Sequence, residues 1–266
     1  MERLKRDANA GNPLAVALDG VVTRKVIKQT IMTTVYGVTR FGARLQVANR
    51  LKEIGFPSEN IFRCSLYLAG ATLECLEEMF VATRRIQDWF DDIALLVSKS
   101  FEKPVTWETP LGLPVMQPYF KERHRNNKIG DLSPKVPQRK CDTQKQKNGF
   151  APNFIHSLDA THMMLTALHA HRKGICYNAV HDCYWTHAVD VDELNVICRQ
   201  QFVRLHTLPI LENLSLHVQN TAPSEEQLAT GGKNRKARLL AEVVEAVPER
   251  GELDINDVLK SVYFFS

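Results

Sequence analysis

The segment from residue 61 to residue 100 most constrains the fold, because its apolar side chains recur at the three- and four-residue spacing of an amphipathic helix. Such a segment buries its apolar face only against other elements, so it predicts core-forming helix with at most one interruption. Caps and periodicity predict further helices over residues 23–36, 40–53, 152–171 and 192–206. The helix over 23–36 is rich in β-branched residues, so contacts outside local preference must hold it.

Two stretches change to the two-residue period of strands. Residues 105–119 predict a hairpin with Pro-Leu-Gly near its turn. Residues 174–180 and 183–189 predict a second hairpin, which turns at His181 and Asp182. The chain is therefore expected to be mixed α/β and mostly helical.

Composition excludes several classes of protein. Of the 266 residues 44% are hydrophobic, enough for a sizeable core, and the net charge of +4 is mild for a nucleic-acid-binding protein. The six cysteines form no CxxC pair, so we expect no disulfide framework, and a reducing compartment fits them. No run approaches the roughly twenty apolar residues that would span a membrane. We expect no targeting segment in the first residues, which lack the long apolar core of a secretory signal and the acid-poor, Ser-rich character of a transit peptide.

Positive charge is concentrated in residues 121–149, which hold nine Lys or Arg and three acids and are expected to form a long exposed loop. Such a density can bind a phosphate backbone through counterion release, or it can be merely solvated. Tyr119, Phe120 and Phe150 flank the segment and permit base stacking. The basic residues are Lys121, Arg123, Arg125, Lys128, Lys135, Arg139, Lys140, Lys145 and Lys147.

The last part of the chain is expected to be helical, with Asp190 or Asp192 capping the helix over 192–206. Small polar residues and a Gly-Gly pair predict a flexible linker over residues 221–236. The three consecutive aromatic residues at 263–265 are expected to dock into a groove rather than lie in water.

In the helix over 23–36, Arg24, Lys28, Met32 and Tyr36 follow one another at intervals of four and share one stripe. Two cations near a helix N-terminus oppose the helix dipole unless an anion docks there. A polyphosphate would resolve that conflict. The alternative is a solvated basic face, with Tyr36 as a packing residue.

His156, Asp159 and His162 recur at intervals of three and lie roughly on one side of their helix. A zinc site would need a fourth ligand and a spacing such as HExxH, which is absent, so metal binding by this triplet is disfavoured. A packed, hydrogen-bonded histidine is one interpretation, and recognition of a hydroxyl group by His156 is another.

Asp182 lies at the predicted tip of a hairpin. A carboxylate there can face a cleft and bind magnesium, which prefers oxygen ligands and substrate phosphates. Two-metal phosphoryl transfer needs more than one such carboxylate, so Asp182 alone cannot perform it. The alternative is that His181 and Asp182 only form a turn.

These features occur together, and in one order, in one family. The motifs RKVIKQTIMTTVYGVTRFG, KNGFAPNFIHSLDATHMMLTALHAHRKG, VHDCYWTHA and the terminal YFFS resemble the C-terminal part of the bacteriophage-type single-subunit RNA polymerases. The resemblance runs from about Asp7 to Ser266, and the WTH after HDCY is similar to the mitochondrial branch. It implies a right-hand fold, with fingers over residues 1–150 and a C-terminal palm over residues 151–266 whose small antiparallel sheet carries the His-Asp hairpin.

The resemblance also implies function. Its reaction is template-directed transfer of nucleotides from nucleoside triphosphates to an RNA 3′ end, with two Mg²⁺ ions in the complete enzyme. The implied partners are template DNA, the RNA transcript and mitochondrial transcription initiation factors. The implied location is the mitochondrial matrix.

For the nucleotide, the resemblance implies that Arg24 and Lys28 hold the phosphates, Lys28 serving catalysis as well. Tyr36, beside Gly37, is similar to the residue that favours ribose over deoxyribose, and His156 to its hydroxyl-sensing partner.

For metal and nucleic acid, the resemblance implies that Asp182 is a catalytic residue that holds both metal ions, supported by its neighbour His181. Phe41 is similar to an aromatic residue beside the template base. Residues 107–149 resemble a specificity hairpin that contacts promoter and transcript. Its expected nucleic-acid contacts are Lys121, Arg123, Arg125, Lys128, Arg139 and Lys140.

The chain also departs from the family. The first catalytic aspartate of the family is expected upstream in a DG-containing motif, and the surroundings of Asp19 in ALDGVV do not match it. The thumb and N-terminal domain are absent as well. We therefore expect that this chain alone does not polymerise RNA.

Two other functions stay open at this point. One is a non-catalytic module, derived from the polymerase, that binds nucleic acid or a partner. The other is a metal-dependent phosphohydrolase, which would need a second acidic cluster beside Asp182; none is evident in the sequence.

Overall fold

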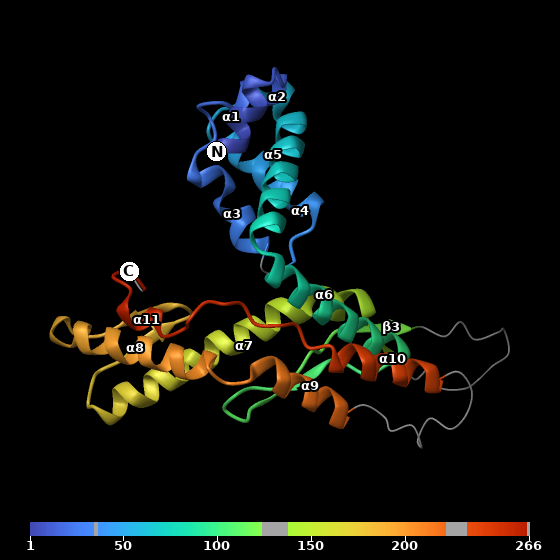
Figure 1. Ribbon diagram of the computed structural model, residues 1–266, viewed down its shortest axis with the longest axis vertical. Helices are drawn as coiled ribbons and strands as arrows, with labels where there is room; N and C mark the ends of the chain where they lie inside the picture. The colour runs from blue at the N-terminus through green and yellow to red at the C-terminus, as the bar shows by residue number, and fades with distance from the viewer. Residues whose placement is uncertain (35–36, 124–137, 222–232, 265–266) are drawn as a thin grey trace. The chain divides into compact units, whose positions relative to one another are not determined.

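The computed structural model of the chain describes residues 1–34, 37–123, 138–221 and 233–264. The chain divides into two compact units, residues 1–87 and residues 88–266, which are treated separately below (Figure 1). Helices dominate and the strands form small antiparallel pairs, so the expected fold class is confirmed at this level. The division into compact units is geometric, and the expected division of roles at residue 150 stays a prediction.

The first unit is a cluster of helices around an apolar core. Leu18, Val47 and Leu51 are fully buried in it, and Val26 and Leu68 nearly so. The helix expected over 40–53 is confirmed, and the helix expected over 23–36 is confirmed over residues 24–34, because residues 35 and 36 lie outside the described residues. The elements are α1 (Glu2–Asn9), α2 (Pro13–Leu18), α3 (Arg24–Thr34), α4 (Arg40–Glu53) and α5 (Ser58–Met79).

Tertiary contacts hold α3, as its β-branched composition requires. Val26 and Thr30 turn into the core, and the Thr30 hydroxyl lies 3.2 Å from Oε1 of Gln46 on α4. The hydroxyl of Thr33 lies 3.3 Å from the same Gln46 oxygen. After the helix, Gly37 takes φ +72°, a left-handed conformation that glycine adopts without strain.

The helical segment expected over 61–100 is confirmed with one interruption. Helix α5 ends at Met79, Phe80 leaves helical geometry, and α6 (Val81–Leu95) follows with a π-helical turn over Leu96–Ser100. In the second unit Phe90 packs against the rings of Phe150 and Phe154, with ring centroids 4.9 and 5.2 Å away. This aromatic cluster, with the buried Trp107, forms one core of the second unit, and Ala170, Ile175, Leu194 and Ile197 form another.

Three antiparallel strand pairs occur in the described part of the second unit. Both predicted hairpins are confirmed, although each strand is shorter than expected. The pairs are β1 (Thr106–Glu108) with β2 (Pro114–Met116), β3 (Phe120–Arg123) with β4 (Gln138–Cys141), and β5 (Asn178–Val180) with β6 (Cys183–Trp185).

The prediction of an exposed loop over 121–149 is wrong at both ends. Residues 120–123 pair with residues 138–141, and helix begins at Thr143. The pairing was hidden because both strands are polar and lack an apolar alternation. Residues 124–137 lie outside the described residues.

The predicted start of the next helix at Pro152 is also wrong, since α7 runs from Thr143 to Arg172 with Pro152 inside it (Figure 1). Asp142 caps the true start by accepting a hydrogen bond from the Lys145 N–H. Burial opposes ionisation of the Asp142 carboxyl, but Lys121 and the Lys145 N–H lower its pKa. Pro152 has no backbone N–H to donate, and buried side-chain contacts of Gln146 and Asn153 hold the helix on either side of it.

Buried amides join α7 to the β1–β2 hairpin. Gln117 and Gln146 are both essentially inaccessible, and the Gln117 amide donates to both the carbonyl and the side-chain oxygen of Gln146 at 3.0 Å. Gln146 donates in return to the Gln117 carbonyl, and Asn153 donates to the Gln117 side chain at 2.9 Å. A Cβ on Gly149 would lie 2.7 Å from the ring of Tyr119, so only glycine fits where the chain passes α7.

The remaining helices are α8 (Val191–His206), α9 (Ile210–Thr221), α10 (Lys233–Glu245) and α11 (Asp257–Lys260). Helix α8 confirms the prediction, but Asp190 makes no side-chain capping bond. Phe264 docks on Phe202, with ring centroids 5.0 Å apart, whereas Tyr263 is 77% exposed. The docking prediction thus holds for one of the terminal aromatics. Phe265 and most of the predicted linker lie outside the described residues.

Candidate nucleotide-binding and metal-binding residues

The predicted phosphate-binding cations lie on the exposed side of α3. Val26 and Thr30 bury the opposite side, so Arg24 and Lys28 are left in solvent. The first turn of α3 has no acidic residue, and no described residue forms an ion pair with Arg24 or Lys28. Two unneutralised cations thus sit beside the positive end of the helix dipole, an arrangement that favours an anionic ligand.

The other predicted nucleotide contacts are described in part. Gly37 is exposed beyond the end of α3, while Tyr36 lies outside the described residues. His156 is exposed on α7 in the second unit. The structure therefore places Arg24, Lys28 and Gly37 in one unit and His156 in the other.

An exposed aromatic and cationic cluster lies on α4 and α5 in the first unit. Phe41 on α4 is 67% exposed and Phe62 on α5 is 61% exposed. The guanidinium carbon of Arg44 lies 5.0 Å from the centroid of each ring, so the cation lies within cation–π range of both. Sequence reasoning identified Phe41 and missed Arg44 and Phe62. The i, i+3 spacing of Phe41 and Arg44 was the only local signal.

The β5–β6 hairpin presents His181 and Asp182 at its tip, as predicted. Val180 pairs with Cys183, so the two residues make the whole turn. His181 takes φ +53°, a left-handed conformation that is uncommon for residues other than glycine, and such strain costs about 1–3 kcal/mol. The Asp182 carboxylate is exposed and forms no ion pair with any described residue, which leaves its oxygens available.

Two hydrogen bonds of the buried His162 hold this hairpin against helices α7 and α8. Nε2 of His162 on α7 lies 2.9 Å from the Cys198 carbonyl on α8, and Nδ1 lies 3.3 Å from the Tyr184 hydroxyl on β6. The carbonyl can only accept, so Nε2 carries the proton and Nδ1 accepts from Tyr184. Burial lowers the pKa of His162, so the ring is neutral at pH 7. The packed, hydrogen-bonded interpretation is confirmed for His162.

Burial also raises the pKa of Tyr177 and Tyr184, the two tyrosines at the base of the hairpin. The pKa of Tyr184 rises above its usual range and that of Tyr177 rises to about 12, chiefly through desolvation. Their rings pack with centroids 5.5 Å apart, and the Thr186 hydroxyl donates to the Cys176 carbonyl at 2.7 Å. These contacts fix the base of the hairpin and leave its tip in solvent.

Asp159, one turn before His162 on α7, is a second carboxylate beside the hairpin that sequence reasoning did not pair with Asp182. Partial burial of its carboxyl raises its pKa, His156 opposes that shift, and the negative charge of Asp182 raises it further. The two carboxylates therefore lie close enough to repel each other, a repulsion that a cation would relieve. The signal available in the sequence was only the His156, Asp159, His162 spacing.

The donor set fits a divalent cation in part. Carboxylate oxygens from Asp182 and Asp159 are ligands that Mg²⁺ prefers. Among the described residues, however, no group of three His, Cys, Asp or Glu side chains is arranged to hold a metal ion. The described chain can contribute ligands to a metal site without completing one.

The predicted nucleic-acid contacts of the basic segment have different surroundings. Lys121 pairs with Asp142 at 3.0 Å and Lys140 with Glu102 at 2.7 Å, so part of their charge is neutralised. Arg139 is exposed on β4. The backbone of Arg123 belongs to β3, but its side chain is not described. Arg125 and Lys128 lie outside the described residues.

All six cysteines are free thiols. Within the described ranges, no helix combines the length and apolar character needed to cross a membrane.

Comparison with known proteins defines the class of this chain. A family model described as DNA-dependent RNA polymerase matches residues 1–241. The chain belongs to this family of DNA-dependent RNA polymerases.

Two of its relatives are named as mitochondrial polymerases. The chain is 48% identical over 274 residues to the human protein named "DNA-directed RNA polymerase, mitochondrial" and 46% identical over 270 residues to the mouse protein of that name. Each comparison covers 98% of this chain but only 21% and 22% of the relative. The tobacco protein named "DNA-directed RNA polymerase 2A" is 43% identical over 276 residues, and the match covers 78% of that protein. The chain thus spans about a fifth of the mammalian relatives.

Proposed function

We propose that the chain is the fingers and C-terminal palm portion of a DNA-directed RNA polymerase that transcribes mitochondrial DNA. The complete enzyme is a nucleotidyltransferase that extends RNA from nucleoside triphosphates along a DNA template. The observation that carries this proposal is the match to mitochondrial polymerases over 98% of the chain. Mitochondrial initiation factors are its proposed partners and the matrix its proposed location.

On α3, Arg24 and Lys28 bind the triphosphate of the incoming nucleotide. Their support is the free positive charge at the helix N-terminus, since no described residue neutralises either side chain. Lys28 also neutralises charge that develops during phosphoryl transfer. Gly37 lets the chain turn at the end of α3, where Tyr36 selects ribose with His156 as the hydroxyl-sensing residue.

Template DNA stacks on Phe41. Two exposed rings around one guanidinium offer apolar faces together with positive charge, a combination that suits nucleic-acid bases and backbone. Residues 107–149 contact promoter DNA and transcript as a specificity hairpin. The basic contacts there are Lys121, Arg123, Arg125, Lys128, Arg139 and Lys140.

In the palm, Asp182 is the metal-holding catalytic carboxylate and His181 supports it at the strained turn. When bound, Mg²⁺ would neutralise negative charge on the reacting phosphates. Asp159 adds negative potential beside Asp182, and the buried His162–Tyr184 bond keeps the hairpin in place. Among the described residues no three such ligands are arranged to hold a metal ion, so the described chain supplies only part of the metal site.

An extension assay tests the proposal. The purified chain of 266 residues, given a primed DNA template, nucleoside triphosphates and Mg²⁺, should produce no extension. A longer polypeptide that adds the upstream palm should extend the primer, and Asp182→Asn in that polypeptide should abolish extension. Magnesium-dependent extension by the 266-residue chain would contradict the proposed incompleteness.

A non-catalytic binding module is the second candidate, and the exposed Phe41, Arg44 and Phe62 cluster favours it. Salt-sensitive DNA binding by the chain, combined with no activity in the longer polypeptide, would favour this candidate over the polymerase.

A further inference from the structure

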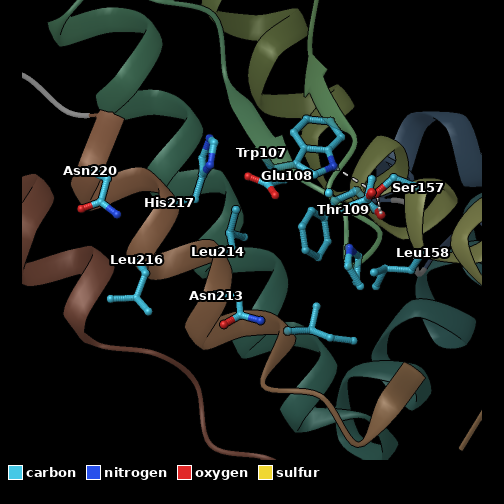
Figure 2. A pocket seen from close by; sticks show the side chains of 14 residues that line it. Trp107, Glu108, Thr109, Ser157, Leu158, Asn213, Leu214, Leu216, His217 and Asn220 are labelled. Atoms are coloured by element: carbon cyan, nitrogen blue, oxygen red, sulfur yellow. Dashed lines mark hydrogen bonds between the residues drawn. The ribbon is translucent and has the colours of Figure 1, made fainter. Parts of the chain in front are cut away.

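A cavity in the second unit is lined in part by the first residues of the segment proposed above as a specificity hairpin, and by none of the candidate nucleotide-binding or metal-binding residues. Its volume is about 500 Å³, and β1, the β1–β2 turn, α7 and α9 surround it. Trp107 closes one wall, where its indole N–H donates to the Ser157 hydroxyl at 3.0 Å (Figure 2). Phe154, Leu158 and Leu214 give it an apolar floor.

The polar side of the cavity comes mainly from one face of α9. Asn213, His217 and Asn220 follow at intervals of four and three, so they share that face (Figure 2). The His217 ring is bonded through Nε2 to the Thr106 hydroxyl at 3.2 Å. The side-chain amides of Asn213 and Asn220 bond no described residue, so their carbonyl oxygens are available as acceptors.

Charge decides which ligand fits. Glu108 is the only charged side chain among the described lining residues, which include no Lys or Arg. Its carboxylate lies over the turn, with Oε1 3.6 Å from the position a Cβ on Gly112 would take, and no described residue pairs with it. In a chain of net charge +4, this is a cavity that repels phosphates and attracts a cation.

We propose that this cavity binds an arginine side chain presented by a partner polypeptide. The planar guanidinium has five donors, and its charge pairs with the Glu108 carboxylate, while the Asn213 and Asn220 amides line other parts of the same cavity. The apolar floor takes the methylene stem of the arginine. Lysine offers a compact, strongly hydrated charge, and a nucleotide carries phosphates that Glu108 repels, so neither suits the cavity as well.

The test uses the 266-residue chain labelled with ¹⁵N and N-acetyl-L-arginine methylamide as the probe. The indole N–H signal of Trp107 should shift with an apparent Kd on the order of 1 mM. The indole signals of Trp89 and Trp185, which do not line the cavity, should stay in place. The uncharged citrulline analogue and guanosine should leave the Trp107 signal unchanged, and the lysine analogue should bind at least threefold more weakly, a roughly 0.7 kcal/mol difference.

Glu108→Gln should weaken arginine binding about tenfold. Glu122→Gln, which removes the same charge on β3 away from the cavity, should leave binding unchanged. Equal binding of citrulline or lysine, or equal loss in both variants, would overturn the proposal. A Trp107 signal that responds to guanosine and not to arginine would overturn it as well. The comparisons between arginine, citrulline, lysine and guanosine use the unaltered chain, so they test the proposed arginine site even if a variant fails to fold.

Discussion

Helix α3 and the β5–β6 hairpin both present charged side chains to solvent, but their support differs. Helix α3 belongs to a packed cluster of helices, and its cations project from a continuous helical face. The hairpin has only three paired residues on each strand and depends on a partly buried hydrogen bond that Tyr184 donates to His162, 22 residues away along the chain. The comparison teaches that a functional group on a helix follows from local periodicity, whereas one on a short hairpin depends on distant partners.

The largest effect is expected on nucleotide binding by α3, because its exposed cations can be replaced without changing the residues that pack in the core. Replacing both Arg24 and Lys28 by alanine should weaken binding of a fluorescent nucleoside triphosphate at least about a hundredfold, because two exposed charge-assisted contacts of about 1.5 kcal/mol each sum to about 3 kcal/mol. Equilibrium fluorescence titration of the chain measures this. Lys25→Ala is the matched control, since Lys25 is equally exposed but lies off the Arg24–Lys28 stripe. An equal loss with Lys25→Ala would show that net charge, not the stripe, binds the triphosphate.

The hairpin should be broken by a change that leaves its own residues intact. His162→Ala removes the partner of both Tyr184 and the Cys198 carbonyl, so we expect the free energy of unfolding to fall by about 2–3 kcal/mol. Urea titration followed by tryptophan fluorescence reports this, because Trp89, Trp107 and Trp185 all lie in the second unit.

The control for that change is His171→Ala, at an exposed position near the end of the same helix. It should alter the free energy of unfolding by less than about 0.5 kcal/mol. If both variants were equally stable, the buried bond would not be what holds the hairpin.

Lowering the pH should destabilise the unit that carries the hairpin, because burial lowers the pKa of His162 below its ordinary value of 6.5. The folded state then binds fewer protons than the unfolded state below that value. The contribution of His162 is fully present above pH 6.5 and is lost as the pH falls towards the lowered pKa.

Urea midpoints measured from pH 7.5 down to pH 5 should therefore decline more steeply for the natural chain than for His162→Gln. The difference between the two curves isolates His162 from the other histidines. Parallel curves would contradict a neutral, buried His162.

The smallest effect is expected at the hairpin tip. His181→Gly removes the left-handed strain but adds freedom to the unfolded chain, so the net gain in stability should be below about 1 kcal/mol. The same urea titration measures it. His187→Gly, at a position with φ −67°, should instead destabilise the chain. A loss of stability in both variants would show that the turn at His181 is not strained.

Local patterns predicted much of the fold. The bounds of α4 match the prediction, and α8 begins one residue earlier, because apolar periodicity defines both helices. The β5–β6 hairpin was found because two β-prone runs flank two turn residues. The true start of α7 and the β3–β4 pair were not predicted, since buried amide contacts between Gln117, Gln146 and Asn153 decide them and polar residues leave no periodic signal.

The candidate site divides in the same way. Arg24, Lys28 and Asp182 could be identified from spacing and turn chemistry, and the structure leaves their charges unpaired among the described residues. The contact between His162 and Tyr184, the repulsion between Asp159 and Asp182, and the position of Phe62 beside Arg44 could not be predicted. Each depends on how separate elements pack together.

The contact at Gly149 has a mechanical consequence. The ring of Tyr119 lies so close to this position that the chain leading into β3 has no room to slide along α7. Asn153 holds the Tyr119 hydroxyl at 3.1 Å, one turn further along the helix. A force applied to the β3–β4 pair would therefore be transmitted at this point to the helix that carries His156, Asp159 and His162.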